Sequence, residues 1–312
     1  MNFILKTEPI YLFHYSLYYL FMSFNEEYSK IFDVVRSDIE RINMLKGIDV
    51  PKPLEVKLSE ILNAPSKHIR PLLSFLYLKA CSGEITETQL KYQTAIELVH
   101  NASLIHDDII DESLLRRNVE TLNSKFDNHL AVIAGDYLLA RALKSVIEIG
   151  QIELVELFRE TLETMTKGEI GQYFDKYNIP VIGEYIKKSE QKTAKLFQAA
   201  ITGAMILNNQ NETLLEKDDF SKVKDFAKNF GIAFQIRDDL INCKTTKSDI
   251  KEGVYTAPVI FSGGIEITDC GLEKTVDLLN NYLNAAKEAL SNLPENIYKQ
   301  YLSELIDLFR HE

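Results

Sequence analysis

The sequence is poor in residues that interrupt helices and in residues that build disulfide or metal frameworks. Its 312 residues include 13 glycines, 8 prolines, 3 cysteines and no tryptophan. So few glycines and prolines favour long helices over a turn-rich β fold. The three cysteines, Cys81, Cys243 and Cys270, match no zinc or redox spacing. Reduced thiols are typical of the cytosol, so we expect a cytoplasmic protein.

Basic residues are also in deficit. The chain has 35 lysines and arginines against 46 aspartates and glutamates, which gives a net charge of −11. Proteins bind nucleic-acid backbones through clustered lysine and arginine, so this balance argues against nucleic acid as a partner. It leaves room for a small anionic ligand held by local basic groups.

Long hydrophobic runs are missing as well, so no transmembrane segment is expected. The aromatic-rich stretch Tyr11–Phe21 is too short to span a bilayer and lacks the cleavage site of a signal peptide. We interpret residues 1–21 as a leader or an upstream-start extension, with contact to a membrane surface as the alternative. The remaining residues, 22–312, are expected to form one large domain.

Amphipathic periodicity runs through most of this domain. Apolar residues recur at three- and four-residue spacing from about Glu26 to Leu45, which predicts a helix. Similar stripes predict further helices over Leu54–Leu62, Leu72–Ala80, Gln89–Ile110, Leu130–Ile149, Ile152–Gly168, Glu184–Leu207, Phe220–Ile241, Val259–Ser262, Leu272–Leu293 and Glu295–Phe309. No segment alternates with period two, so the predicted fold is a single all-α bundle. Leu130–Ile149 and Ile152–Gly168 are apolar over a wide arc, which places them inside it.

Two acidic clusters end apolar helices in this prediction. Asp107 and Asp111 lie four residues apart and share a helix face, and Asp238 and Asn242 repeat this spacing. Neighbouring carboxylates repel unless a cation lies between them. Mg²⁺ takes one or two carboxylates together with water and phosphate oxygens. One such cluster is often a solvated helix end, but two in matching contexts favour a metal site.

Basic residues accompany both clusters. Arg116 and Arg117 follow the first, Lys247 follows the second, and Lys192 lies on a helix between them. Divalent metal together with arginine and lysine is the usual means of holding a diphosphate.

With these residues in view, the chain resembles a trans-isoprenyl diphosphate synthase of the polyprenyl branch. The resemblance covers residues 67 to 258. The matching stretches are Lys67-His68-Ile69-Arg70-Pro71, Glu97 to Asp111, Arg116-Arg117, Ala134 to Leu138, Gly168-Glu169 with Gln172, Lys192-Thr193-Ala194, and Phe234-Gln235 with Asp238-Asp239. Three positions depart from the family pattern: Asn242 replaces a third aspartate, Asn118 replaces glycine, and Val254 replaces a frequent lysine.

The resemblance implies a helical bundle with a central cavity in residues 22–312. It implies a Mg²⁺-dependent enzyme that condenses an allylic diphosphate with isopentenyl diphosphate. By this resemblance the metal ligands are Asp107, Asp111 and Asp238, and the catalytic set adds Lys192, Thr193 and Gln235. The allylic diphosphate site comprises Arg116, Lys192, Lys247, Asp108 and Asp239, and the isopentenyl diphosphate site comprises Lys67, Arg70, His100 and Arg117. A homodimer is expected, and the product is expected to pass to a membrane.

Chain length is predicted from the helix before the first cluster. Ala102 and Ser103 are small, so a shaft beside this helix, whose turns repeat every 5.4 Å or so, stays open for a product of about C30 to C50. A farnesyl or geranylgeranyl diphosphate synthase is the main alternative. A terpene cyclase would not need the second anion site, and a non-catalytic subunit of a heteromeric synthase is expected to lose metal aspartates.

Overall fold

The computed structural model describes residues 26–45, 47–208 and 217–310. The proposed leader, residues 1–21, lies outside this part. A helix over 26–33 is followed by α2 (Arg36–Ile39), α3 (Lys52–Leu62), α4 (Ile69–Ala80), α5 (Glu87–Ile110), β1 (Leu115–Arg116), β2 (Val119–Glu120), α6 (Leu122–Lys125), α7 (Asn128–Ile147), α8 (Ile152–Phe174), α9 (Ile182–Ser189), the π-helical segment η1 (Glu190–Ala194), α10 (Lys195–Asn208), α11 (Lys217–Lys244), α12 (Ser248–Lys251), α13 (Ala257–Ser262), α14 (Asp269–Ala289) and α15 (Ile297–Leu308).

Local sequence signals explain where several helices begin and end. Thr86 begins α5 because its hydroxyl accepts a hydrogen bond from the Gln89 backbone N–H, and Asp127 begins α7 by accepting from Leu130 N. The helix α13 ends at Gly263, whose φ of 71° lies in the left-handed region that glycine adopts readily.

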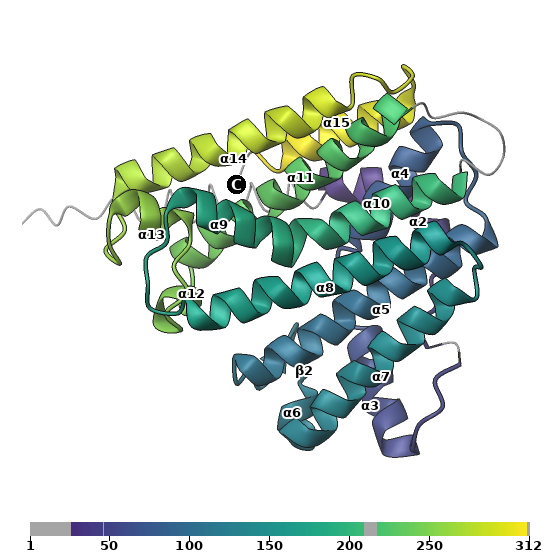
Figure 1. The fold of residues 1–312 in the computed structure, drawn as a ribbon, viewed down its shortest axis with the longest axis horizontal. Helices are drawn as coiled ribbons and strands as arrows, with labels where there is room; N and C mark the ends of the chain where they lie inside the picture. Colours follow the sequence, from purple (N-terminus) through teal and green to yellow (C-terminus); the bar gives the residue numbers. More distant parts are fainter. Residues whose placement is uncertain (1–25, 46, 209–216, 311–312) are drawn as a thin grey trace, which may run out of the picture.

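The helices form a bundle around α4, α5, α10 and α11. In Figure 1, α14, α10, α8, α5 and α7 cross the view one below another. The helix α5 packs along α7, α11 packs along α14, and α10 contacts α4, α5, α8 and α11. The predicted all-α fold is confirmed. Within the described residues, no helix is long and apolar enough to cross a membrane.

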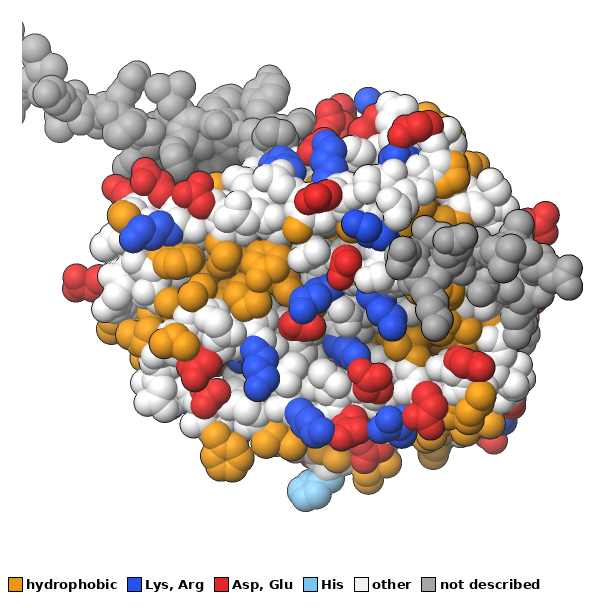
Figure 2. Space-filling view, turned by 45° about the horizontal axis from the view of Figure 1, so that its top comes forward, with side chains coloured by type: hydrophobic (Ala, Val, Ile, Leu, Met, Phe, Trp, Pro, Cys, Tyr) orange, Lys and Arg blue, Asp and Glu red, His pale blue; other side chains and the backbone are white. Residues whose placement is uncertain are grey.

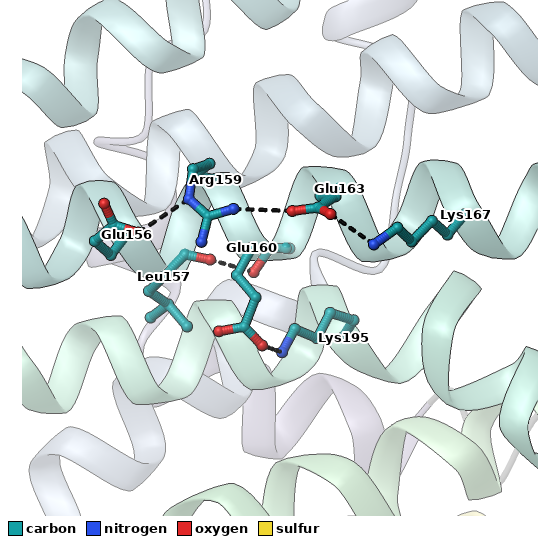
Figure 3. Close-up of polar contacts among 8 residues, drawn as sticks. Glu156, Leu157, Arg159, Glu160, Glu163, Lys167 and Lys195 are labelled. Carbon is teal, nitrogen blue, oxygen red and sulfur yellow. Dashed lines mark hydrogen bonds and ion pairs between the residues drawn. The ribbon is translucent and has the colours of Figure 1, made fainter.

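The helix α8 lies on the surface of the bundle, contrary to the prediction that its wide apolar arc would place it inside. Figure 3 shows a solvated row of ion pairs on it. Arg159 Nε lies 2.9 Å from Glu156, Arg159 Nη1 lies 2.8 Å from Glu163, and Lys195 of α10 pairs with Glu160. The helix also extends to Phe174, which is exposed. Charged side chains at helical spacing favour water over the bundle interior, so this face stays outside.

The prediction for α7 is wrong in the same way. Leu138 and Ala142 are fully buried against the core, but Ile133 and Ile147 are exposed. An apolar face on the surface of a single chain is a common feature of subunit interfaces. On the face drawn in Figure 2, basic and acidic side chains are interspersed around an area of hydrophobic side chains.

Three further details differ from the sequence prediction. A two-stranded antiparallel hairpin pairs Leu115 with Glu120, although no period-two alternation marks it. The first predicted helix breaks after residue 33 and does not reach Leu45. The second acidic cluster does not end its helix, because α11 continues to Lys244. Hydrogen bonds over a few residues set these features, and hydrophobic periodicity does not report them.

Candidate active site

Three adjoining cavities lie among α4, α5, α8, η1 and α11. The central cavity, of about 400 Å³, joins a basic cavity of about 570 Å³ through shared wall residues Arg70, His100, Phe234 and Asp238. It joins an outer cavity, of about 130 Å³, through Lys192, Thr193 and Gln235. One part of the lining of the central cavity is apolar and includes Val99, Leu139, Leu162 and Met165.

The first acidic cluster lies where the central and outer cavities meet. Asp107 lines the central cavity, and Asp111, which caps α5, is exposed and lines the outer one. Burial raises the pKa of Asp107 to about 6 although Lys192 opposes this, and the negative charges of Glu169 and Asp111 raise it further. Because the surroundings disfavour the ionised form of Asp107, a cation bound beside this carboxylate would stabilise it.

The second cluster faces the first across the central cavity. Asp238 lines both the central and the basic cavity, and its side chain is exposed to solvent there. Loss of hydration there raises its pKa to about 6, against the opposing charges of Arg237 and Lys67. Asn242 does not replace the missing carboxylate, because it carries no charge and lines none of the three cavities; its amide N–H donates to Ser248 Oγ at 2.7 Å and its oxygen accepts from Asp249 N.

Lys192 and Thr193 lie within η1, where one helical turn contains an extra residue. Such π-helical turns are rare and occur often at functional sites. Lys192 Nζ lies 2.5 Å from Glu169 of α8. Burial lowers the pKa of Lys192, but Asp107 and Glu169 outweigh it and raise the pKa. The extra residue fits because Gly231 of α11 lets η1 approach closely: a Cβ there would lie 2.5 Å from Ala194 Cα.

A chain of hydrogen bonds runs behind the wall of the central cavity. Thr193 Oγ1 donates to Gln235 Oε1 at 2.5 Å, and Gln235 Nε2 donates to Asp239 Oδ1 at 2.7 Å. Tyr185 donates its hydroxyl proton to Asp239 Oδ2 at 2.6 Å. Asp239 is buried, which raises its pKa to about 7. We call these four residues the Thr193–Tyr185 chain.

The basic cavity brings together the four residues predicted for isopentenyl diphosphate. Lys67, Arg70, His100 and Arg117 all line it. Burial lowers the pKa of Arg70 to about 10, and burial and the charge of Arg70 hold the pKa of His100 well below its usual value. His100 is therefore neutral at pH 7 in the free protein. A bound anion would relieve this concentration of positive charge.

Four predicted residues are not brought to the place expected of them. Asp108 accepts a hydrogen bond from Arg116 Nε at 2.6 Å, and the pair lines a separate small hollow. Lys247 is exposed at the start of α12 and lines none of the three cavities. Ala102 is fully buried in the core and does not line the central cavity, whereas Ser103 does.

Other residues complete the walls without having been predicted. Glu97 is buried in the basic cavity and lies 3.0 Å from His68 Nδ1. Lys188 and Asp249 line the outer cavity. Lys188 stands one turn before Lys192, so helical spacing could have indicated it. Glu97 begins the matching stretch from Glu97 to Asp111, although no role was assigned to it, and Asp249 offered no signal beyond its charge.

The donor set fits Mg²⁺ bound together with a substrate. Among the described residues, no group of three histidine, cysteine or acidic side chains converges closely enough to hold a metal ion by itself. Mg²⁺ commonly keeps several waters and takes one or two carboxylates plus phosphate oxygens. Asp107, Asp111 and Asp238 line connected cavities and would supply those carboxylates.

The polyprenyl synthetase family model matches residues 51–298. The chain belongs to the polyprenyl synthetase family. The predicted family and enzyme class, a trans-polyprenyl diphosphate synthase, are thereby confirmed.

Individual relatives agree with this assignment. A prenyl transferase of Cyanidium caldarium is 30% identical over 89% of this chain and 96% of its own length. A decaprenyl-diphosphate synthase of Dictyostelium discoideum is 30% identical over 89% of this chain and 70% of its own. A polyprenyl synthase structure from Caulobacter crescentus, complexed with calcium and isoprenyl diphosphate, has a TM-score of 0.80 at 23% identity and covers 92% of this chain and 97% of that one. This last likeness shows the shared fold.

Proposed function

We propose that this synthetase extends an allylic diphosphate with isopentenyl diphosphate, using Mg²⁺, to give a long-chain polyprenyl diphosphate. The observation that carries the proposal is the arrangement of the cavities. A basic cavity and a cavity ringed by carboxylates and lysine both open onto an apolar one, where Asp238, Arg70 and Gln235 lie. Two diphosphates and a hydrocarbon tail can thus meet at one point.

Each group of residues has a part in this reaction. Arg70, Lys67 and Arg117 bind the isopentenyl diphosphate by charge-assisted hydrogen bonds. Lys192, at the join of the central and outer cavities, contacts the allylic diphosphate. Mg²⁺, held when bound by Asp107, Asp111 and Asp238, supplies positive charge that makes the diphosphate a good leaving group.

The proposed reaction breaks the allylic C–O bond first, then forms the new C–C bond and finally releases a proton. The allylic C–O bond breaks, its electron pair leaves with the diphosphate, and positive charge develops on the allylic carbon. The oxygens of Thr193 and Gln235, on the cavity wall, stabilise that charge. The isopentenyl double bond then forms the new C–C bond, and a proton leaves the adjacent carbon for the released pyrophosphate.

The product length follows from the apolar wall. The decaprenyl-diphosphate synthase relative supports a long product, in the range of about C30 to C50, for this chain. The apolar lining of the central cavity includes Leu139, Leu162 and Met165. A long tail therefore has to displace these side chains, and the flexible Met165 can rotate aside at small cost.

The proposed enzyme is a homodimer of two copies of this chain. The exposed apolar side chains of α7, Val132, Ile133 and Ile147, form a face suited to a homodimer. Light scattering should give twice the chain mass, and Ile133→Glu should shift it toward monomer. A monomer mass for the unsubstituted protein at micromolar concentration would contradict this proposal.

An assay with Mg²⁺, a C15 or C20 allylic diphosphate and isopentenyl diphosphate tests the function. Linear products above about C25, seen by mass spectrometry, support it, since each condensation adds a five-carbon unit. Linear products that stop at C20 favour a short-chain synthase, and a cyclic hydrocarbon favours a cyclase. Activity that appears only with another chain would indicate a subunit of a heteromeric synthase.

A further inference from the structure

The Thr193–Tyr185 chain ends in a group that no sequence motif indicates. Tyr185 is 1% exposed and Asp239 is 4% exposed, so their mutual hydrogen bond is largely shielded from bulk water. Asp239 accepts from two donors, Tyr185 on α9 and Gln235 on α11. An isolated buried carboxylate is costly, and these two hydrogen bonds fix where each of its oxygens points.

The amide of Gln235 has two ends of opposite polarity, and its orientation matters at this site. Its N–H is held by Asp239, and its oxygen accepts from Thr193. The Thr193 hydroxyl proton is thereby used, which leaves lone pairs on both oxygens. An amide turned the other way would place N–H donors beside Thr193, where the proposed reaction develops positive charge.

We propose that Tyr185 is a positioning residue, which holds Asp239 so that Asp239 fixes the Gln235 amide with its oxygen toward Thr193 and the reacting centre. This inference rests on the proposed function. Tyr185 lines the outer cavity and not the central one, so it acts through Asp239 and not by touching the allylic carbon. Burial, reinforced by Asp239, keeps the pKa of Tyr185 far above 10, so its hydroxyl stays a donor at working pH.

The test is a double-mutant cycle on Tyr185 and Gln235. Tyr185→Phe should lower kcat about tenfold, as for the loss of a buried hydrogen bond, with both KM values within about twofold of wild type. In a Gln235→Ala background, Tyr185→Phe should cost nothing further, because the group it positions is gone. Asp239→Asn, which disturbs the same contacts, should show the same loss of kcat.

Tyr92→Phe is the matched control. Tyr92 is likewise fully buried and donates its hydroxyl to a backbone oxygen, that of Ala199, at 2.9 Å. Its loss should lower the unfolding temperature and leave kcat unchanged. Equal kcat losses from Tyr185→Phe in both backgrounds, or a change confined to KM, would overturn the proposal.

The same double-mutant cycle can be measured through the free energy of unfolding, which requires no substrate. Tyr185→Phe should be more destabilising once Gln235 is alanine, because the buried Asp239 carboxylate then loses both of its side-chain donors. Coupling there supports the positioning role even if the wild-type protein makes no prenyl product, and strict additivity rejects it. Failure of the proposed function is seen separately, in the wild-type product assay.

Discussion

Substitution of Ser103 by phenylalanine should shorten the product. Ser103 lines the central cavity, and its hydroxyl donates to the His100 backbone oxygen at 2.8 Å. Its neighbour Ala102, the other residue predicted to set chain length, packs in the core shared by α5 and α7. A ring at position 103 thus enters open space, whereas a ring at position 102 meets packed atoms.

The magnitude follows from the helix. Ser103 lies one turn, about 6 Å, below Asp107, and Val99, also on the cavity wall, lies about 12 Å below it. Three backbone bonds span at most about 3.5 Å, so the four bonds of an isoprene unit span about 5 Å. A block at Ser103 leaves room for only about one to two units between it and the diphosphate end, so Ser103→Phe should end synthesis near C10 to C15.

Mass spectrometry of the products gives the answer, with Ser103→Ala as the control that removes only the hydroxyl. Ser103→Phe should keep the wild-type unfolding temperature, whereas Ala102→Phe should lose about 1 to 3 kcal/mol of stability through overpacking. A folded Ser103→Phe protein with the wild-type product distribution would refute a shaft along α5.

Three more predictions concern the charged walls. Asp107→Asn should lower kcat/KM by about 10³-fold or more, because the charge of the bound metal is lost, and unchanged turnover would remove Asp107 from the site. Without metal, the same substitution should raise the free energy of unfolding by about 1 kcal/mol at pH 8 but not at pH 4, since the folded site disfavours the ionised carboxylate. The affinity for Mg²⁺ should fall as the pH drops below about 6, because Asp107 and Asp238 gain protons there. Calorimetry with inorganic pyrophosphate present measures this affinity, and an affinity that stays constant down to pH 5 would contradict the prediction. Lys188→Met should raise the inhibition constant of inorganic pyrophosphate about tenfold, because Lys188 lines the outer cavity. Lys187 is exposed, so Lys187→Met should leave this constant unchanged. Equal effects of the two substitutions would show that only the net charge of the protein matters.

Much of the site was predictable because its residues form local motifs. The pairs Asp107 with Asp111 and Lys67 with Arg70 lie on or beside single helices, where spacing alone sets which side chains share a face. The sequence also determined the helical fold, through its apolar periodicity and scarcity of glycine and proline. These features depend on neighbours within a few residues, so they can be deduced before any tertiary contact is known.

Tertiary structure decided the rest, because packing between helices selects among neighbours that the sequence treats alike. It turned Asp108 to Arg116, left Lys247 outside and placed Ser103 instead of Ala102 on the cavity wall. The orientation of the Gln235 amide depends on Tyr185, 50 positions away along the chain, and only the packing of α9 against α11 brings their shared carboxylate within reach of both. The sequence specifies the chemical groups, and the bundle decides which of them meet, because long-range packing and burial fix where each side chain points.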